Sequence, residues 1–251
     1  MNYKISNLFN FKNKIVVITG VSGQLGKIFS EFYLANGAKV YGLDIVKPKN
    51  KVLFIKCDIT NELEMTNSIS TIYKKEKKIN IFVNNAGIST FSKYQLRTKN
   101  DFMKILETNL LPSFLSIKIL SQKAKFLDKL KIVNISSIYG VLSPDFKIYS
   151  KGDRFSPEVY GASKAGLIQL SNYYANLLAK KNININSISP GGVKSLKTQN
   201  KKFIDNYIKN VPKNRMANPD DFITCIAFLS SDYSDYITGQ NIIIDGGLSL
   251  K

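Results

Sequence analysis

The chain has 251 residues, of which 44% are hydrophobic, so it is long enough for one large α/β domain or two small ones with a substantial core. It carries 36 Lys and Arg against 18 Asp and Glu, a formal net charge of +18, and it contains no histidine. The missing histidine excludes His-dependent catalytic triads and most zinc sites, so acid–base chemistry must use Tyr, Lys, Cys, Ser or carboxylates.

The positive charge invites a nucleic-acid interpretation, but its composition argues against one. All basic residues except Arg97, Arg154 and Arg215 are lysines, and they are scattered along the chain. Base recognition favours arginine, whereas lysine enrichment with many Asn and Ile is typical of A/T-rich codon usage. We therefore expect no nucleic-acid partner. The two cysteines, Cys57 and Cys225, are too few for a disulfide framework or a metal cluster, and we expect buried thiols and no metal.

The N-terminal part of the chain gives no targeting signal. Its first apolar run, residues 15–18, follows Lys12 and Lys14 and is far too short for a signal peptide or a membrane span. We expect a soluble, cytoplasmic protein with no membrane partner.

Short β-branched runs alternate with longer segments of helical period along the chain. This pattern is typical of a parallel sheet with crossover helices and predicts one doubly wound α/β domain over residues 1–251, with helices on both faces of the sheet. One helix is expected from 101 to about 126 and another from 160 to 179. Seven strands are predicted, at residues 15–19, 39–43, 52–57, 79–83, 131–135, 183–187 and 241–244.

A glycine-rich segment joins the first predicted strand to the first helix. Glycines allow a sharp turn close to a pyrophosphate, and the free amides of the new helix attract its charge. The alternative is an ordinary structural turn. The candidate phosphate-binding residues are Gly20, Ser22, Gly23, Gln24, Leu25 and Gly26.

Two aspartates at the ends of the next strands could complete a nucleotide site. Asp44 could accept hydrogen bonds from the adenosine ribose and would repel a 2′-phosphate, which favours NAD over NADP. Lys47 and Lys49 could soften this preference, so NADP stays open. Asp58, with Ile59, could meet the adenine amino group.

Tyr160 and Lys164 are four residues apart in a predicted helix, so they share one face. An ammonium near a phenol favours phenolate and lowers the tyrosine pKa towards the working pH, which allows acid–base catalysis without histidine. An ordinary surface pair is the alternative.

Together these motifs resemble the short-chain dehydrogenase/reductases over essentially the whole chain. The resemblance rests on the ordered motifs Thr19-Gly20…Gly26, Asp58, Asn84-Asn85-Ala86-Gly87, Asn109, Ser137, Tyr160-x-x-x-Lys164, Pro190-Gly191 and Asp245-Gly246-Gly247. It implies a Rossmann domain that binds NAD(H) or NADP(H) and transfers a hydride to or from a carbonyl or alcohol carbon.

The resemblance also implies a role for each matched residue. Tyr160 would be the general acid/base, Lys164 would lower its pKa and hold the nicotinamide ribose, and Ser137 would bind the substrate oxygen. Asn109, inside the helix from residue 101, would position the lysine. Further cofactor contacts are implied for Asn85, Ala86, Gly87, Pro190, Gly191 and Val193.

Two features depart from the family pattern. Gln24 occupies the place of the middle glycine, with Gly23 one residue earlier, and the gap between Ser137 and Tyr160 is about ten residues longer than usual. We expect the insertion, residues 141–157, to cover the substrate, together with a substrate loop at about 194–216.

Six basic residues near these segments could suit an anionic sugar substrate, with chance placement as the alternative: Lys93, Arg97, Lys99, Lys147, Lys151 and Arg154. The long gap also resembles oxidoreductases of bacterial surface-glycan and flagellin-sugar biosynthesis, which suggests a sugar, a sugar phosphate or a nucleotide sugar. The alternatives are an enzyme like the 3-oxoacyl-carrier-protein reductases and a non-catalytic nucleotide-binding scaffold. A homodimer or homotetramer is expected by resemblance.

Overall fold

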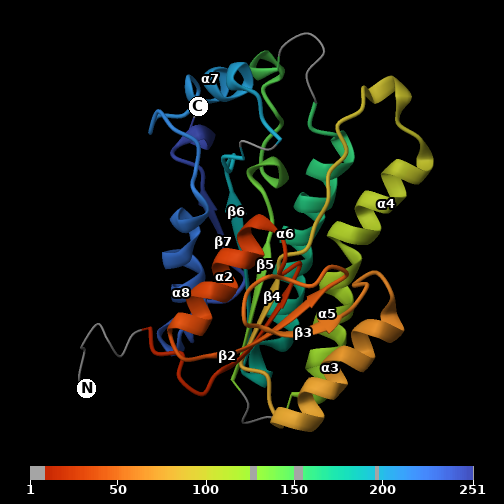
Figure 1. The fold of residues 1–251 in the computed structure, drawn as a ribbon, viewed down its shortest axis with the longest axis vertical. Helices are drawn as coiled ribbons and strands as arrows, with labels where there is room; N and C mark the ends of the chain where they lie inside the picture. The colour runs from red at the N-terminus through yellow and green to blue at the C-terminus, as the bar shows by residue number, and fades with distance from the viewer. Residues whose placement is uncertain (1–8, 125–128, 150–154, 196–197, 251) are drawn as a thin grey trace.

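Seven strands form one parallel sheet in the computed structural model, which describes residues 9–124, 129–149, 155–195 and 198–250. Their order is β3-β2-β1-β4-β5-β6-β7, and Figure 1 shows them in the centre of the molecule. The strands are β1 (Ile15–Thr19), β2 (Lys39–Asp44), β3 (Leu53–Lys56), β4 (Ile81–Asn84), β5 (Leu130–Ile135), β6 (Ile183–Pro190) and β7 (Asn241–Ile244). The doubly wound fold expected from the sequence is confirmed.

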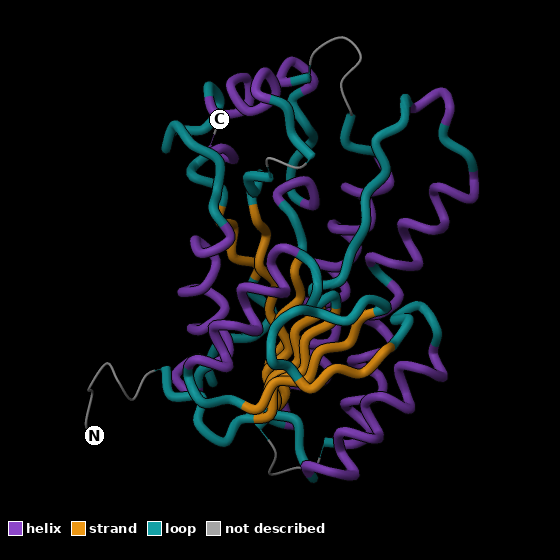
Figure 2. Tube along the Cα trace, in the orientation of Figure 1, coloured by secondary structure: helices purple, strands orange, loops and turns teal. Residues whose placement is uncertain are grey.

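The helices cover both faces of the sheet, as Figures 1 and 2 show. The α-helices are α2 (Gln24–Ala35), α3 (Glu62–Glu76), α4 (Lys99–Asn109), α5 (Leu111–Lys123), α6 (Glu158–Leu178), α7 (Lys201–Ile208) and α8 (Ile223–Ser230). No helix within the described ranges is long and apolar enough to span a membrane.

Alternation along the strands divides the core into two layers. Val16 and Ile18 of β1 pack with α2 and α8, whereas Ile15 and Val17 pack with α3, α5 and α6. Because both faces are covered, the central strand β1 is apolar on both sides from Ile15 to Ile18, a pattern typical of parallel sheets. All five residues of β1 are buried.

The single helix expected from 101 to about 126 is wrong. The structure has two helices, α4 and α5, which break at Leu110, while residues 125–128 lie outside the described part of the chain. Pro112 in the first turn of α5 lacks an N–H and clashes with a preceding helical turn, which explains the break. Asn109 is consequently the last residue of α4 and not a residue inside a longer helix.

The strand order reverses between β1 and β4, which are neighbours in the sheet. The chain leaves β1 at Thr19 towards one face and leaves β4 at Asn84 towards the other. Such a reversal opens a crevice at the carboxyl ends of the strands, where open α/β sheets bind their ligands.

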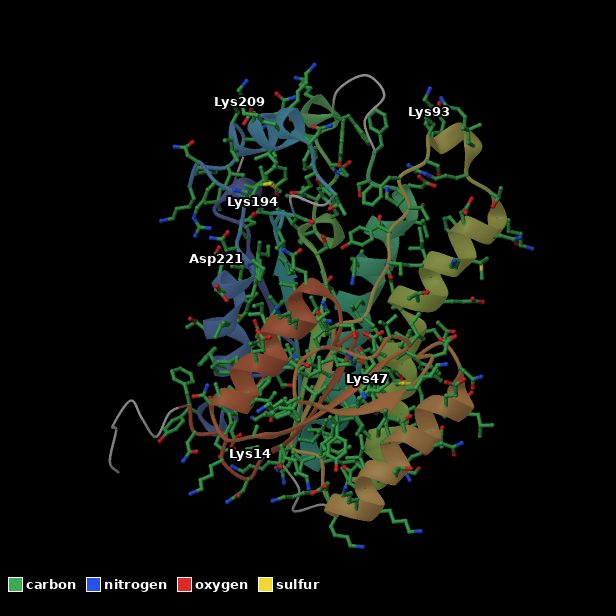
Figure 3. All side chains as sticks on the ribbon, in the orientation of Figure 1. Lys14, Lys47, Lys93, Lys194, Lys209 and Asp221 are labelled. Carbon is green, nitrogen blue, oxygen red and sulfur yellow. The ribbon has the colours of Figure 1, made fainter. Side chains whose placement is uncertain are left out.

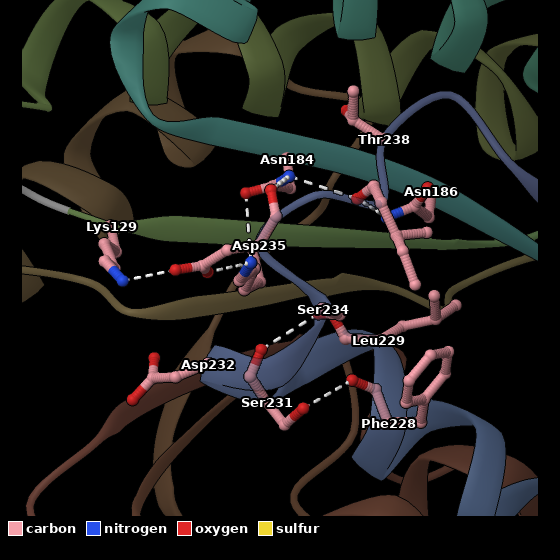
Figure 4. A network of polar contacts seen from close by, with 12 residues as sticks. Lys129, Asn184, Asn186, Phe228, Leu229, Ser231, Asp232, Ser234, Asp235 and Thr238 are labelled. Atoms are coloured by element: carbon pink, nitrogen blue, oxygen red, sulfur yellow. Dashed lines mark hydrogen bonds and ion pairs between the residues drawn. The ribbon is translucent and has the colours of Figure 1, made fainter. Parts of the chain in front are cut away.

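The opposite end of the sheet is held by a polar network around Asp235 (Figure 4). Its carboxylate accepts a hydrogen bond of 2.6 Å from Lys131, which is buried on β5, and also pairs with Lys129. Lys131 donates to Asn184 of β6 at 3.0 Å, and Asn184 donates to the Asp235 carbonyl at 2.9 Å. The network therefore connects β5 and β6 to the segment before β7.

Partial burial raises the pKa of Asp235, but hydrogen bonds from Lys129 and Lys131 outweigh it and hold that pKa below its ordinary value. A carboxylate with a lowered pKa in the folded state stabilises the fold above its unfolded pKa, and this stabilisation is lost as the pH falls through the folded pKa.

We expect Asp235→Asn to lower the free energy of unfolding at pH 7 by about 2 kcal/mol, because it leaves the buried Lys131 without its charged partner while Asp235 itself is partly exposed. Urea denaturation measures this loss, and the gap to wild type should narrow below about pH 4. Asp232→Asn is the control, since it removes the pair with Lys14 and only a longer-range charge interaction with Lys129 and Lys131, and it should cost under about 1 kcal/mol. Equal losses of unfolding free energy in the two variants would contradict the stabilising role given to Asp235.

Candidate active site

The loops that follow β1 and β4 are bound directly to each other. Thr19 Oγ1 accepts hydrogen bonds from the amides of Asn85 and Ala86, at 3.0 and 3.1 Å. Asn85 Nδ2 returns two bonds of 3.0 Å, to the carbonyls of Thr19 and Gly20. Gly20 has φ +65°, and a Cβ on it would lie 2.7 Å from Ala86 Cα, so only glycine fits at this contact.

Helix α2 begins against this contact with its first turn free of side-chain caps. Its N-cap, Gly23, makes no capping hydrogen bond, so the leading amides of the helix are available to an anion. A Cβ on Gly26 would lie 2.2 Å from the Gly20 carbonyl oxygen, so Gly26 allows the close turn. These features fit the pyrophosphate of a dinucleotide.

Gln24, the departure from the family pattern, reaches away from this turn. Its Nε2 donates to the Lys194 carbonyl at 2.7 Å, which connects the glycine loop to the segment after β6. The turn keeps Gly20 and Gly26, and the longer side chain forms a contact that glycine could not make.

The two predicted nucleotide-site aspartates lie at the ends of β2 and β3. Asp44 accepts from the Ser22 amide at 2.9 Å and from the Val46 amide at 3.0 Å, so its carboxylate is fixed beside the glycine loop. Asp58 accepts from the amide and the hydroxyl of Thr60, at 2.9 and 2.7 Å.

The predicted catalytic residues meet where β5 and α6 approach the crevice. Ser137 follows β5, and its side chain is hydrogen-bonded to Tyr160 near the start of α6. Lys164, one turn further along α6, is 4% exposed and donates from Nζ to the Ile135 carbonyl at 2.8 Å. The Lys164 ammonium lies 5.8 Å from the centre of the Tyr160 ring.

Burial dominates the protonation of this pair. It lowers the pKa of Lys164 to about 8, because a charged ammonium is poorly solvated there. Burial also raises the pKa of Tyr160, and the hydrogen bond from Ser137 offsets this only in part. Desolvation thus dominates the pKa of Tyr160 in this structure, and the lowering of that pKa by Lys164 stays a prediction.

Asn109 holds the loop that lies beside Lys164. Its Oδ1 accepts from the Ile88 amide at 2.8 Å, and its Nδ2 donates to the Ile88 carbonyl at 3.0 Å and to Ser163 at 3.2 Å. A Cβ on Gly87 would lie 3.3 Å from Asn109 Oδ1 and 3.5 Å from Lys164 Nζ. Asn109 and Lys164 therefore flank Gly87.

The turn that follows β6 also lines the site. Gly191 donates to the Ile244 carbonyl at 2.8 Å, and Gly192 donates to the Tyr207 hydroxyl at 2.6 Å. The Val193 carbonyl accepts from Gln199 Nε2 at 2.9 Å. Tyr207 belongs to α7, so this turn is tied to a helix that covers the crevice.

The insertion packs on α7 through an aromatic cluster, defined here as Phe146, Tyr149, Phe155, Phe203 and Tyr207. The ring centre of Tyr149 lies 5.1 Å from that of Phe155 and 5.6 Å from that of Phe203. The ring centres of Phe203 and Tyr207 are 5.9 Å apart. Figure 1 shows α7 close to the short helical turn at Phe146–Ile148, above the carboxyl ends of the strands. Residues 150–154 of the insertion lie outside the described part of the chain.

All predicted site residues except Gly26 and Asn109 line a single cavity of about 1210 Å³. Several other residues that line this cavity were not named individually from the sequence. Tyr139 could have been found from its place beside Ser137, whereas Phe203 and Tyr207 carry no local signal, because only the fold brings α7 to the cavity. Phe91 and Tyr139 lie outside every predicted segment, whereas further lining residues fall within the segments 141–157 and 194–216 but were not singled out, among them Tyr149, Ser156, Gln199, Phe203, Tyr207 and Met216.

The cations expected at the substrate side are not gathered there among the described residues. Lys93, Lys99 and Lys147 do not line the cavity, and Arg97 is paired with Glu158. Lys151 and Arg154 lie outside the described part of the chain. Figure 3 shows the labelled lysines far apart from one another, from one end of the molecule to the other, which fits the compositional explanation of the net charge.

Comparisons with known proteins agree with this geometry. A family model described as enoyl-(acyl carrier protein) reductase matches residues 33–249. An NAD-dependent glycerol dehydrogenase from Listeria innocua is 31% identical over 97% of this chain and 96% of its own length. The 3-oxoacyl-(acyl-carrier-protein) reductase FabG of Rickettsia felis is 32% identical over 96% of this chain and 99% of its own.

Solved structures are similar over the same length. A short-chain dehydrogenase from Leptospira borgpetersenii with bound NAD+ has a TM-score of 0.89 at 38% identity, covering 99% of this chain and 97% of that one. The aldohexose dehydrogenase of Thermoplasma acidophilum has a TM-score of 0.84 at 26% identity, covering 97% of both chains. With its glycine turn and its Ser137, Tyr160 and Lys164 in one cavity, this chain belongs to the short-chain dehydrogenase/reductase family of oxidoreductases.

Proposed function

We propose that the protein is an NAD-dependent oxidoreductase that acts on a hydroxyl-bearing carbon of a sugar or a related polyol. The observation that carries the proposal is the position of Tyr160, Ser137 and Lys164 in the same cavity as the glycine turn and Asp44. A nicotinamide dinucleotide, when bound, accepts or supplies the hydride.

The residues around the cavity would hold the dinucleotide along its length. Asp58 and Ile59 would bind the adenine end, Asp44 the ribose, and the glycine turn with the start of α2 the pyrophosphate. Asn85, Ala86 and Gly87, the turn from Pro190 to Val193, and Lys164 would hold the nicotinamide end.

The chain's own residues would manage the proton. In alcohol oxidation, Tyr160 takes the proton of the substrate hydroxyl while the carbon that bears this hydroxyl gives up a hydride to the nicotinamide. In reduction, Tyr160 returns a proton to the substrate oxygen. Ser137 donates to the substrate oxygen and stabilises the negative charge that develops on it. Lys164 stabilises the phenolate form of Tyr160, an effect that weakens as the pH rises through its own pKa of about 8.

The substrate side supports a polyhydroxylated compound. It presents aromatic rings that also carry hydroxyls, those of Tyr139, Tyr149 and Tyr207, together with Ser156. Sugars offer C–H faces to such rings and hydroxyls to the phenols. The similarity to enzymes named for glycerol and aldohexoses points the same way. Phosphorylated sugars, nucleotide sugars and a role in surface-glycan synthesis stay predictions.

A reductase of acyl-carrier-protein thioesters is the second candidate. Several relatives are named as 3-oxoacyl-(acyl-carrier-protein) reductases, and a net charge of +18 would attract an acidic carrier. A substrate comparison separates the two candidates.

The described outer faces of α5 and α6 favour a homodimer or homotetramer. Phe114, Tyr173 and Leu177 are exposed there, at 37%, 61% and 60%. Burying these large apolar side chains between subunits would remove them from water. Light scattering should give a dimer or tetramer, and the Tyr173→Glu/Leu177→Glu double variant should shift it towards monomer; a wild-type monomer would contradict this.

We expect Tyr160→Phe to lower kcat at least about 100-fold while NADH binding is retained, because only the proton-transferring hydroxyl is lost. NADH absorbance would follow oxidation of glycerol, D-glucose and D-glucose 6-phosphate and reduction of an acetoacetyl thioester. Tyr173→Phe, the same change on the exposed side of α6, should leave kcat unchanged. Full turnover by Tyr160→Phe would refute the mechanism, and fastest turnover of the thioester would favour the second candidate.

We expect the wild type to bind NADH more tightly than NADPH, and Asp44→Asn to reduce that preference by about tenfold or more, because the charge that repels a 2′-phosphate is gone. Fluorescence titration with both cofactors measures this. Asp58→Asn, at the adenine end, should change both affinities alike. Tighter binding of NADPH by the wild type would overturn the Asp44 argument.

A further inference from the structure

Arg97 is the one arginine that the sequence places near the substrate side and the structure describes. From the sequence, Arg97 could either face the active-site mouth as a cation for an anionic substrate or lie near it by chance. Instead its side chain is 6% exposed, and the residue does not line the cavity. A guanidinium so well covered must have its donors bound within the protein.

The Arg97 guanidinium contacts three segments of the chain. Its Nε and Nη2 donate to the Ser92 carbonyl, at 3.1 and 2.8 Å. Nη2 also donates to the Phe155 carbonyl, at 3.5 Å, and Nη1 pairs with Glu158. One side chain thus closes its own loop, binds the end of the insertion and binds the first residue of α6.

The loop that Arg97 closes, residues 88–97 and here called the mouth loop, forms part of the cavity wall through Ser89 and Phe91. Its beginning is held by Asn109, whose amide makes two hydrogen bonds to the Ile88 backbone. Its end is held by Arg97. Ser89 and Phe91 therefore lie between two points of attachment. One is Asn109, beside Lys164, and the other is the start of α6.

The start of α6 receives no support from a side-chain cap. Its N-cap, Pro157, makes no capping hydrogen bond, and Tyr160 lies in this first turn. Glu158 suits the positive end of the helix, and its pairing with Arg97 fixes that turn against the mouth loop. The pair therefore connects the mouth loop, which carries Phe91, to the helical turn that carries Tyr160.

We propose that Arg97 is a positioning residue that holds the mouth loop and the end of the insertion against the first turn of α6, and so determines how well substrate is held at Tyr160. It does not contact the substrate. Its loss should loosen the substrate side of the cavity while the cofactor side, built on β1, β2 and β4, stays intact.

The test compares Arg97→Met and Arg97→Lys with Lys14→Met. Lys14 also forms an ion pair distant in sequence, with Asp232, but at the opposite end of the molecule from the mouth loop, as the labels of Lys14 and Lys93 in Figure 3 show. Hydrogen–deuterium exchange of the NADH complex needs no substrate. Arg97→Met should speed exchange in residues 88–97 and 157–161 and leave the glycine loop unchanged, and Lys14→Met should change neither region.

The kinetic arm rests on the proposed function and uses glycerol or D-glucose, whichever the wild type oxidises faster. Arg97→Met should raise KM about tenfold or more with kcat within about threefold and an unchanged Kd for NADH, the pattern of lost substrate binding. Arg97→Lys keeps the pair with Glu158 but cannot donate like the fork of arginine, so it should restore the wild-type KM in part. Glu158→Gln should give a smaller effect of the same kind.

Two results would overturn the proposal. The first is that Arg97→Met behaves like Lys14→Met in exchange. The second is a rise in KM for D-glucose 6-phosphate without one for D-glucose, which would make Arg97 a direct ligand of an anionic substrate. If none of these compounds is oxidised, the proposed function has failed, and the exchange experiment still decides the role of Arg97.

Discussion

The site depends on the contact between the carboxyl ends of β1 and β4, the neighbouring strands at which the strand order reverses. Four hydrogen bonds join Thr19 and Gly20 at the end of β1 to Asn85 and Ala86 after β4, and Gly20 lies against Ala86 with no room for a Cβ. This contact fixes where α2 begins and where the chain leaves towards Asn109. The cofactor half of the cavity and one anchor of the substrate half therefore share a single origin, which explains why motifs far apart in sequence converge there.

Much of the fold could be predicted because its signals are local. Alternation between β-branched runs and helical periodicity gave the seven strands, and the ends of β1, β2 and β5 carry residues whose chemistry identifies the cavity. The helix break at Leu110 was missed because apolar periodicity continues through it, while Pro112 lies where a new helix accepts proline. Asn109 was identified, but its place at the end of α4 was not.

The substrate side could not be predicted in the same way. Tyr149, Phe203 and Tyr207 meet only because the insertion folds onto α7, a contact between segments about fifty residues apart with no shared pattern. Arg97 shows what a sequence cannot reveal about a charged side chain. The sequence indicates that a cation is near the site, but only the fold shows that its guanidinium is already bound by Glu158 and two backbone carbonyls.

The hydrogen bond between Gln24 and Lys194 connects two walls of the cavity. It links the glycine turn to the segment after β6, although Gln24 and Lys194 are 170 positions apart in the sequence. A single hydrogen bond of this kind contributes about 1 kcal/mol, so thermal motion breaks it often. A glutamine at this position thus joins two segments that line the cavity from distant parts of the sequence, a connection that glycine could not make.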